Sequence, residues 1–359
     1  MSDSPDKIRI TFDEVDSIVL EQSQPLPVPA AMGAAPSDGP RQWGSVASVG
    51  APAALQGEQA GAGSFFLKGW VYLGFSGMLG AFIGWAICEP AFNDTGAVSW
   101  GNAMLFPLML MLQCAGLAVA ESMVERSFQK ALKRGLLALG LGILFGFFFA
   151  ALAGVIFMAL LRTVAMRSHE IHATDPAVWF SRAFAWVVFG ISGGVVYGIV
   201  GQSKKKCLYG ILGGMVGAGF GGLLFDPISV MMGGAALSRM VGLSILGLCT
   251  GVSIGLVESA LKDRWLYVSA GPLAGKQFIL YKAVTHFGSQ QSNDVYLFKD
   301  TSILPNHAAI QLRGPQTVLL AQGLVTVGGR PVTQHVLRSG DVIQIGRYAF
   351  NFQEKQASR

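Results

Sequence analysis

The chain has 359 residues, of which 52% are apolar and only 13% are charged, whereas a typical soluble domain is about 25% charged. It contains 47 glycines, close to twice the average share of about 7%. This composition excludes an ordinary soluble enzyme and indicates closely packed membrane helices. The formal net charge of +5 is uneven, because residues 1–65 carry −5 while residues 66–262 and 263–359 carry +5 each.

Residues 1–65 are predicted to form a disordered acidic tail. Apart from Ile8–Leu20 the segment is rich in Ala, Gly, Pro, Ser and Gln, and it cannot bury enough surface to offset the entropy of ordering. No basic leader with an apolar core opens the chain, so we expect no removable signal peptide. The alternating stretch around Thr11 is interpreted as part of an exposed acidic tail without a partner; a docking motif for the chain's own C-terminal domain or a neighbour's is the alternative.

Residues 66–262 are predicted to form an α-helical polytopic membrane domain. Six charge-free apolar runs of 17 to 27 residues approach the roughly 20 residues that cross a bilayer as a helix. The runs are Gly69–Cys88, Ala103–Ala120, Gly135–Leu161, Phe184–Val200, Cys207–Phe225 and Val241–Val257. Lys and Arg concentrate in the connections on one side of the alternating helices, which predicts a multi-pass protein with both termini in the cytoplasm.

Three hairpin repeats are predicted within this membrane domain. The segment Gly77–Ala81 matches Gly214–Ala218 at a shift of 137 residues, and Glu89-Pro90 and Glu121 match Asp226-Pro227 and Glu258 at the same shift. A shift of 57 relates Arg182 to Arg239 and Gly190 to Gly247, and a shift of 72 relates Arg134 to Lys206. The pattern indicates parallel repeats, each entering from the cytoplasm.

Glycines at four-residue spacing, such as Gly190, Gly194 and Gly198, share a helix face and favour close helix packing; a glycine-lined conduit is the alternative. Ionisable groups occur only near the helix ends, where we expect acid–arginine pairs between hairpins and contact of Glu258 with Lys262. Pro90 and Pro227 are predicted to stop their helices.

No metal site, cofactor or catalytic constellation is predicted. The outer-loop group of His169, Glu170, His172 and Asp175 is interpreted as a polar loop, with a metal site as the less favoured alternative. The four cysteines fall in or beside membrane helices without a CxxC pair, so packing is their expected role. No phosphate loop or nucleophile motif occurs, so we predict that the protein is not an enzyme.

Residues 263–359 are predicted to form an all-β sandwich. Turn residues separate seven strand candidates: Trp265–Ser269, Lys276–Leu280, Asp294–Phe298, Ala308–Leu312, Thr317–Leu320, Val342–Ile345 and Tyr348–Phe352. This many short strands in under 100 residues is typical of a sandwich. The residues alone indicate a small, basic, cytoplasmic recognition domain.

This segment also resembles the forkhead-associated (FHA) domain family. The resemblance rests on Gly271-Pro272, Phe287-Gly288, Asn293-Asp294-Val295, Asn306-His307-Ala308 and Leu337 through Gly340-Asp341 to Gly346. It implies an eleven-stranded sandwich whose loops at one end grip phosphothreonine peptides.

The same resemblance places a degenerate peptide site on the loops. The family's Arg after the third-strand glycine is Ser289, its Ser-Arg-x-His motif reads Leu304-Pro305-Asn306-His307, and its Asn-Gly turn is assigned to Gly328-Gly329. Loss of these groups removes most of the charge-assisted contacts on which phosphate recognition depends. Lys299, Arg313 and Arg330 are candidates for a compensating cation. The tentative peptide-binding residues are Gly288, Ser289, Asn293, Leu304, Asn306, His307, Gly328, Gly329 and Arg330.

The sequence therefore predicts a membrane-anchored signalling scaffold that presents a cytoplasmic FHA-like docking domain, without phosphothreonine recognition. The competing hypothesis is a channel or transporter gated by that domain. The expected partners are a cytoplasmic protein or peptide and membrane lipid, without nucleic acid, and a homo-oligomer is left open. The domain combination suggests a bacterial inner membrane.

Overall fold

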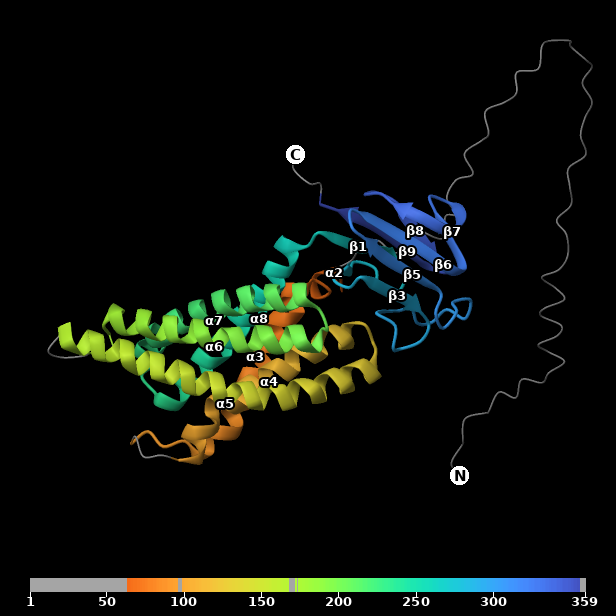
Figure 1. Cartoon of the computed structure of the whole chain (residues 1–359). Helices are drawn as coiled ribbons and strands as arrows, with labels where there is room; N and C mark the ends of the chain where they lie inside the picture. The colour runs from red at the N-terminus through yellow and green to blue at the C-terminus, as the bar shows by residue number, and fades with distance from the viewer. Residues whose placement is uncertain (1–62, 96–98, 168–171, 173, 356–359) are drawn as a thin grey trace, which may run out of the picture. The chain divides into compact units, whose positions relative to one another are not determined.

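The computed structural model describes residues 63–95, 99–167, 172 and 174–355, all within one compact unit of residues 52–359 (Figure 1). The predicted tail up to residue 62, with its Thr11 motif, lies outside the described residues, as do His169 and Glu170. The described residues form a helical domain followed by a β domain.

Six helices in the described part are long and apolar enough to cross a membrane, which confirms the predicted count. They are α3 (Gly69–Cys88), α4 (Trp100–Val124), α5 (Phe128–Arg167), α6 (Pro176–Val200), α7 (Lys204–Met232) and α8 (Ala235–Leu261), with the short α2 (Gly63–Phe66) before them and the 3-10 turn η2 (Glu89–Ala91) after α3. Five of the six exceed the predicted apolar runs because polar residues extend them. Ser99, for example, caps α4 by accepting a hydrogen bond from the Asn102 backbone N–H.

The two predicted proline stops behave differently. Pro90 lies in η2, directly after α3 ends at Cys88, as predicted. The prediction for Pro227 was wrong, because α7 continues through it to Met232. A proline costs a helix one backbone hydrogen bond, and neighbouring helices can make that loss tolerable in a membrane helix.

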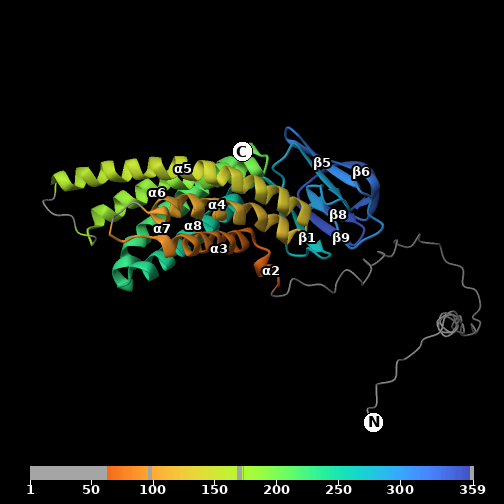
Figure 2. The ribbon, with the colours of Figure 1, turned by 90° about the horizontal axis from the view of Figure 1, so that it is seen from below.

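The helices pack in chain order and close on themselves, since α8 contacts α3 as well as α7 (Figure 2). The α6–α7 and α8–α3 interfaces use corresponding residues. Gly190 of α6 meets Gly214 of α7, and Gly247 of α8 meets Gly77 of α3, with each glycine facing the other's backbone carbonyl. A side chain at any of these positions would collide with backbone, so the glycine spacing serves close helix crossing.

Acid–arginine pairs join the same two interfaces, as the sequence predicted. Arg182 of α6 lies 2.9 Å from Asp226 of α7, and Arg239 of α8 lies 2.5 Å from Glu89 at the end of α3. Arg239 also pairs with the more exposed Asp94 at 2.5 Å. These interactions recur at the sequence shifts of 57 and 137 residues.

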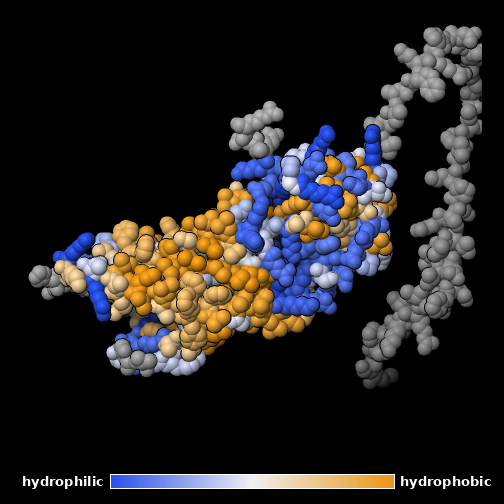
Figure 3. Space-filling model, in the orientation of Figure 1, coloured by the Kyte–Doolittle hydropathy of each residue, from blue (hydrophilic) through white to orange (hydrophobic). Residues whose placement is uncertain are grey.

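On the face shown in Figure 3, apolar residues cover most of the helical domain between its two ends, whereas hydrophilic residues predominate on the β domain. Helix α5 is the most exposed of the six long helices, because only 11% of its most apolar stretch of 18 residues is buried. Its exposed residues include Leu136, Leu144, Phe148 and Val155. Such a surface is typical of a membrane helix facing lipid.

Within the described residues no group of three His, Cys, Asp or Glu side chains could hold a metal ion.

Nine strands make up the described β domain: β1 (Arg264–Ala270), β2 (Gln277–Ile279), β3 (Val284–Gly288), β4 (Val295–Tyr296), β5 (Ala308–Arg313), β6 (Gln316–Val327), β7 (Arg330–Leu337), β8 (Val342–Ile345) and β9 (Tyr348–Glu354). They pair in the order β2-β1-β9-β8-β6-β5-β3-β4, with β7 against β6. All pairs are antiparallel except β3 with β4.

The strand prediction missed β3 and β7. Strand β7 contains Pro331 and is mostly exposed, so its sequence lacks the apolar alternation on which strand prediction depends. The predicted sandwich is nevertheless confirmed, with its own core of buried side chains. Tyr348, Phe350, Phe352, Leu266 and Phe287 are among the most buried.

Candidate peptide-recognition site

His307 organises the loops at one end of the β domain. Its ring is 2% exposed; Nδ1 accepts a hydrogen bond from the Leu304 backbone N–H, and Nε2 lies 3.1 Å from the Leu324 carbonyl oxygen. The His307 carbonyl in turn accepts from the backbone N–H groups of Gln322 and Gly323. The side chain therefore ties the β4–β5 loop to the middle of β6, which is a structural role.

The β3–β4 loop is held against the β4–β5 loop. The Ser289 backbone N–H donates to the Leu304 carbonyl at 3.0 Å, and the Asn293 side-chain amide donates to the Pro305 carbonyl. Gly288 permits this contact, because a side chain there would collide with the Pro305 carbonyl. The structure thus brings together the predicted residues 288, 289, 293, 304 and 307.

The outer surface of these loops is uncharged. Leu304 and Leu324 are 46% and 75% exposed, Asn306 and Gln322 are exposed, and Ser289 is half-buried. Segments 288–293, 304–307 and 322–324 contain no Lys, Arg, Asp or Glu. This surface offers hydrogen-bonding and apolar groups in place of a phosphate-binding cluster.

Gly328-Gly329 was assigned as the turn that holds the peptide backbone, but this turn does not lie next to His307. These glycines form the two-residue turn between β6 and β7, where Val327 pairs with Arg330, and both have the positive φ that such turns need. Gly328 donates to the Val342 carbonyl, so the turn contacts β8. The segment next to His307 is Gln322–Leu324, where the β6–β7 register shifts between Leu320 and Val325. The polar-glycine pair Gln322-Gly323 inside a strand was the signal for this irregularity.

Two of the three candidate compensating cations lie away from the loops around His307. Arg313 ends β5, whereas His307 immediately precedes the first residue of that strand, so about 20 Å of strand separates them. Arg330 begins β7 beside the Gly328-Gly329 turn and pairs with Val327, so it lies roughly 10 Å along the strand from Leu324. Lys299 lies near Arg347, which donates to its carbonyl. Arg313 and Arg330 therefore lie outside the loops that His307 connects, whereas Lys299 belongs to the β4–β5 loop, five residues before Leu304.

A family model described as the FHA domain matches residues 285–346, the span that contains these loops. The C-terminal part of the chain is an FHA domain. The match covers the residues that carried the resemblance except Gly271-Pro272, and the predicted fold is thereby confirmed.

Curated relatives match about a quarter to a third of this chain. The glycogen accumulation regulator GarA of Mycobacterium tuberculosis is 32% identical over 90 residues, covering 24% of this chain and 55% of GarA. The oxoglutarate dehydrogenase inhibitor of Corynebacterium jeikeium is likewise 32% identical over 90 residues, covering 24% of this chain and 62% of that protein. The chain therefore spans little more than half the length of these relatives.

A solved FHA-domain structure is among those similar to this chain. The FhaA FHA domain, crystallised with the intracellular domain of Rv3910, is 23% identical, with a TM-score of 0.23 and coverage of 25% of this chain and 100% of that one.

The FHA domain contacts the helical domain through the connection between α4 and α5. Ser127 donates to the Gln291 carbonyl at 3.1 Å, and the Lys130 ammonium donates to the Asp294 carbonyl at 3.0 Å. Both acceptors lie in the β3–β4 loop, next to the recognition residues. One recognition loop is therefore anchored to the helical domain.

A buried ion pair reinforces this contact. Lys276 of the FHA domain lies 3.0 Å from Glu125 of the α4–α5 connection, with side chains 2% and 4% exposed. Lys130 lies 3.5 Å from the same carboxylate, and the Lys276 ammonium lies 4.6 Å from the centre of the Phe278 ring. Such a pair fixes an arrangement strongly, because separating it leaves a charge without a partner.

Proposed function

We propose that the protein is a non-enzymatic, membrane-anchored adaptor whose FHA domain docks a cytoplasmic protein or peptide without requiring phosphothreonine. The observation that carries the proposal is the site around His307. Its loops are fully assembled by backbone hydrogen bonds, yet Ser289 and Leu304 occupy the positions where the family has phosphate-contacting Arg and Ser. A structured but uncharged surface favours a ligand recognised by hydrogen bonds and apolar contact.

We propose further that the six apolar helices anchor the protein in a bacterial inner membrane with both termini in the cytoplasm. The distribution of Lys and Arg supports this orientation, since Lys204, Lys205 and Lys206 open α7 at the end that the FHA domain contacts. A signalling role in this setting is consistent with the regulators among the curated relatives.

Site-specific photocrosslinking in cells tests the docking proposal. A photoreactive residue replaces Leu324 in the full-length chain, and a matched control replaces Gln316, which is also exposed but begins β6 at its opposite end. We expect a discrete protein adduct at position 324 that survives phosphatase treatment and is missing at position 316. Equal adducts at both positions, or an adduct that phosphatase abolishes, would contradict the proposal.

The channel or transporter hypothesis draws on one observation, the anchoring of the β3–β4 loop to the α4–α5 connection. This contact could transmit ligand binding on the FHA domain to the helices. Ion flux through the full-length chain in proteoliposomes separates the two functions. Flux that changes on partner binding would favour the channel, whereas tight glycine crossings support the adaptor.

A further inference from the structure

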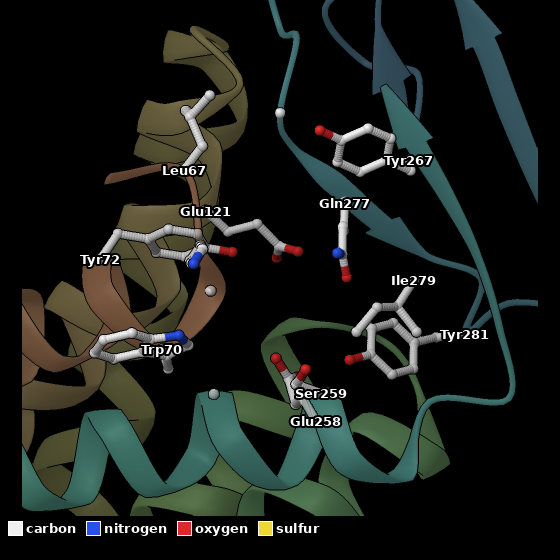
Figure 4. A pocket seen from close by; sticks show the side chains of 14 residues that line it. Leu67, Trp70, Tyr72, Glu121, Glu258, Ser259, Tyr267, Gln277, Ile279 and Tyr281 are labelled. Atoms are coloured by element: carbon white, nitrogen blue, oxygen red, sulfur yellow. The ribbon is translucent and has the colours of Figure 1, made fainter. Parts of the chain in front are cut away.

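A cavity of about 370 Å³ lies where the cytoplasmic ends of α3, α4 and α8 meet strands β1 and β2 (Figure 4). Its walls carry the aromatic side chains of Trp70, Tyr72, Tyr267 and Tyr281. Two carboxylates, Glu121 and Glu258, also line it. The docking proposal does not use this cavity.

The two carboxylates differ in their partners. Glu121 lies 2.6 Å from the Lys206 ammonium and 3.2 Å from the Arg134 guanidinium. Glu258 is 7% exposed and has no ion pair in the described part of the chain; its Oε2 accepts from the Tyr197 hydroxyl at 3.3 Å. The predicted contact of Glu258 with Lys262 was wrong, since Lys262 bonds Gln277 instead.

The second carboxylate oxygen, Glu258 Oε1, is buried. The buried Tyr281 hydroxyl points toward Glu258 and Ser259 in Figure 4 and is, with Tyr197, a neutral hydroxyl neighbour of this carboxylate. Burial and the nearby Glu258 carboxylate raise the pKa of Tyr281 well above its usual value, so this hydroxyl keeps its proton. A buried carboxylate whose neighbours are neutral hydroxyls and that has no ion pair among the described residues is costly, which indicates that a ligand supplies the cation.

The repeat shows what is missing beside Glu258. Glu121 on α4 pairs with Arg134 on α5. In the repeat, the α4–α5 interface corresponds to the α8–α3 interface, which contains Glu258. Glu258 corresponds to Glu121 at a shift of 137, and Arg134 corresponds to Lys206 at a shift of 72. The residue of α3 that corresponds to Lys206 lies 137 positions earlier in the chain and is Gly69. Gly69 lines the cavity together with Glu258. Glycine thus stands where the corresponding positions carry a cation.

We propose that this cavity binds a ligand whose ammonium group replaces the missing side-chain cation beside Glu258, namely the ammonium–phosphate zwitterion of an ethanolamine head group. Aromatic walls and a carboxylate suit an ammonium ion. The exposed Lys68, which also lines the cavity, suits the phosphate. The exposed rings of Phe65 and Phe66 lie three and two residues before Lys68 and suit an acyl chain at the membrane surface.

The test uses the full-length chain in detergent micelles, titrated with phosphatidylethanolamine, phosphatidylcholine or phosphatidylglycerol and followed by native mass spectrometry. We expect phosphatidylethanolamine to bind about tenfold more tightly than phosphatidylcholine, whose quaternary ammonium cannot donate a hydrogen bond. Equal binding of these two lipids would overturn the proposal. Displacement of bound lipid by soluble phosphoethanolamine would show that the head group suffices; retention would show that the ligand is the lipid.

Point variants distinguish a specific loss of lipid binding from a general loss of protein stability. Glu258→Gln should weaken phosphatidylethanolamine binding about tenfold, whereas Asp263→Asn, an exposed acid nearby, should leave it unchanged. Gly69→Lys should abolish binding and raise the thermal midpoint, because the new ammonium occupies the site. A side chain fits there, since a Cβ at Gly69 would meet the Tyr72 hydroxyl at an ordinary 3.8 Å. Undiminished lipid binding by folded Gly69→Lys would overturn the assignment.

Discussion

Replacing Lys276 by Met tests whether the FHA domain is fixed to the helical domain by a buried charge pair. The methionine keeps the apolar stem beside Phe278 but removes the ammonium 3.0 Å from Glu125. Breaking a buried pair typically costs about 3–5 kcal/mol. We expect about 3 kcal/mol for Lys276→Met, because Lys130 still lies 3.5 Å from the Glu125 carboxylate.

Hydrogen exchange of the full-length chain measures this loss. The backbone N–H of Lys276 donates to the Leu273 carbonyl and that of Gly275 to the Val268 carbonyl, so both amides report local opening. A loss of about 3 kcal/mol accelerates exchange roughly a hundredfold. The double variant Lys276→Met/Glu125→Gln should recover much of the protection, because no buried charge is left without a partner.

Lys282→Met is the matched control. Lys282 pairs with Asp294 at 2.9 Å within the same domain, but the side chains are 33% and 22% exposed. A pair this accessible is worth less than about 1 kcal/mol, and exchange should change less than about fivefold. If Lys276→Met behaves like this control, or if the double variant is no better protected than the single one, the buried-pair reasoning is refuted.

Three further outcomes are expected. Gly247→Val should prevent stable folding in thermal melts, because it drives a side chain into a backbone carbonyl, whereas Gly154→Val, with open space around it, should be tolerated. Asp300→Ala should lower the thermal midpoint at neutral pH, because the Ser302 hydroxyl and backbone N–H groups lower the Asp300 pKa in the folded state. This contribution is present above about pH 4, the ordinary aspartate pKa, and lost as pH falls through the lowered pKa; a constant difference across pH would contradict it. Ser289→Arg with Leu304→Ser should create at least about tenfold preference for phosphothreonine over threonine peptides in calorimetry; equal affinities would refute the loop assignment.

The helices were predictable because their signal is local. Twenty consecutive apolar residues identify a span without knowledge of its neighbours, and α3 begins and ends where its apolar run does. The acid–arginine pairs followed from charges at helix ends. Pro227 could not be judged in this way, because its effect depends on whether other helices support the backbone around it.

The recognition site was only partly predictable, since motif spacing does not report strand irregularities. His307, Ser289 and Leu304 meet as the resemblance implied. The Gly328-Gly329 turn resembled the family's turn in composition but belongs to the next hairpin. Only the register shift near Gln322 brings β6 back to His307, and such a shift depends on pairing with β7, a strand whose exposed sequence was not recognised.

The repeat shifts carry more information when they are combined with contacts. Three interfaces join successive hairpins, at α4–α5, α6–α7 and α8–α3. The corresponding positions in these interfaces are Glu121 with Arg134, Gly201 with Lys206, and Glu258 with Gly69. Lys206 lacks an acid in its own interface and reaches Glu121, so both cations serve one carboxylate. The three pairs of positions contain two carboxylates and two cations, but both cations lie beside Glu121. Glu258 is the group left over, and a cavity lies beside it because its counterpart has no side chain.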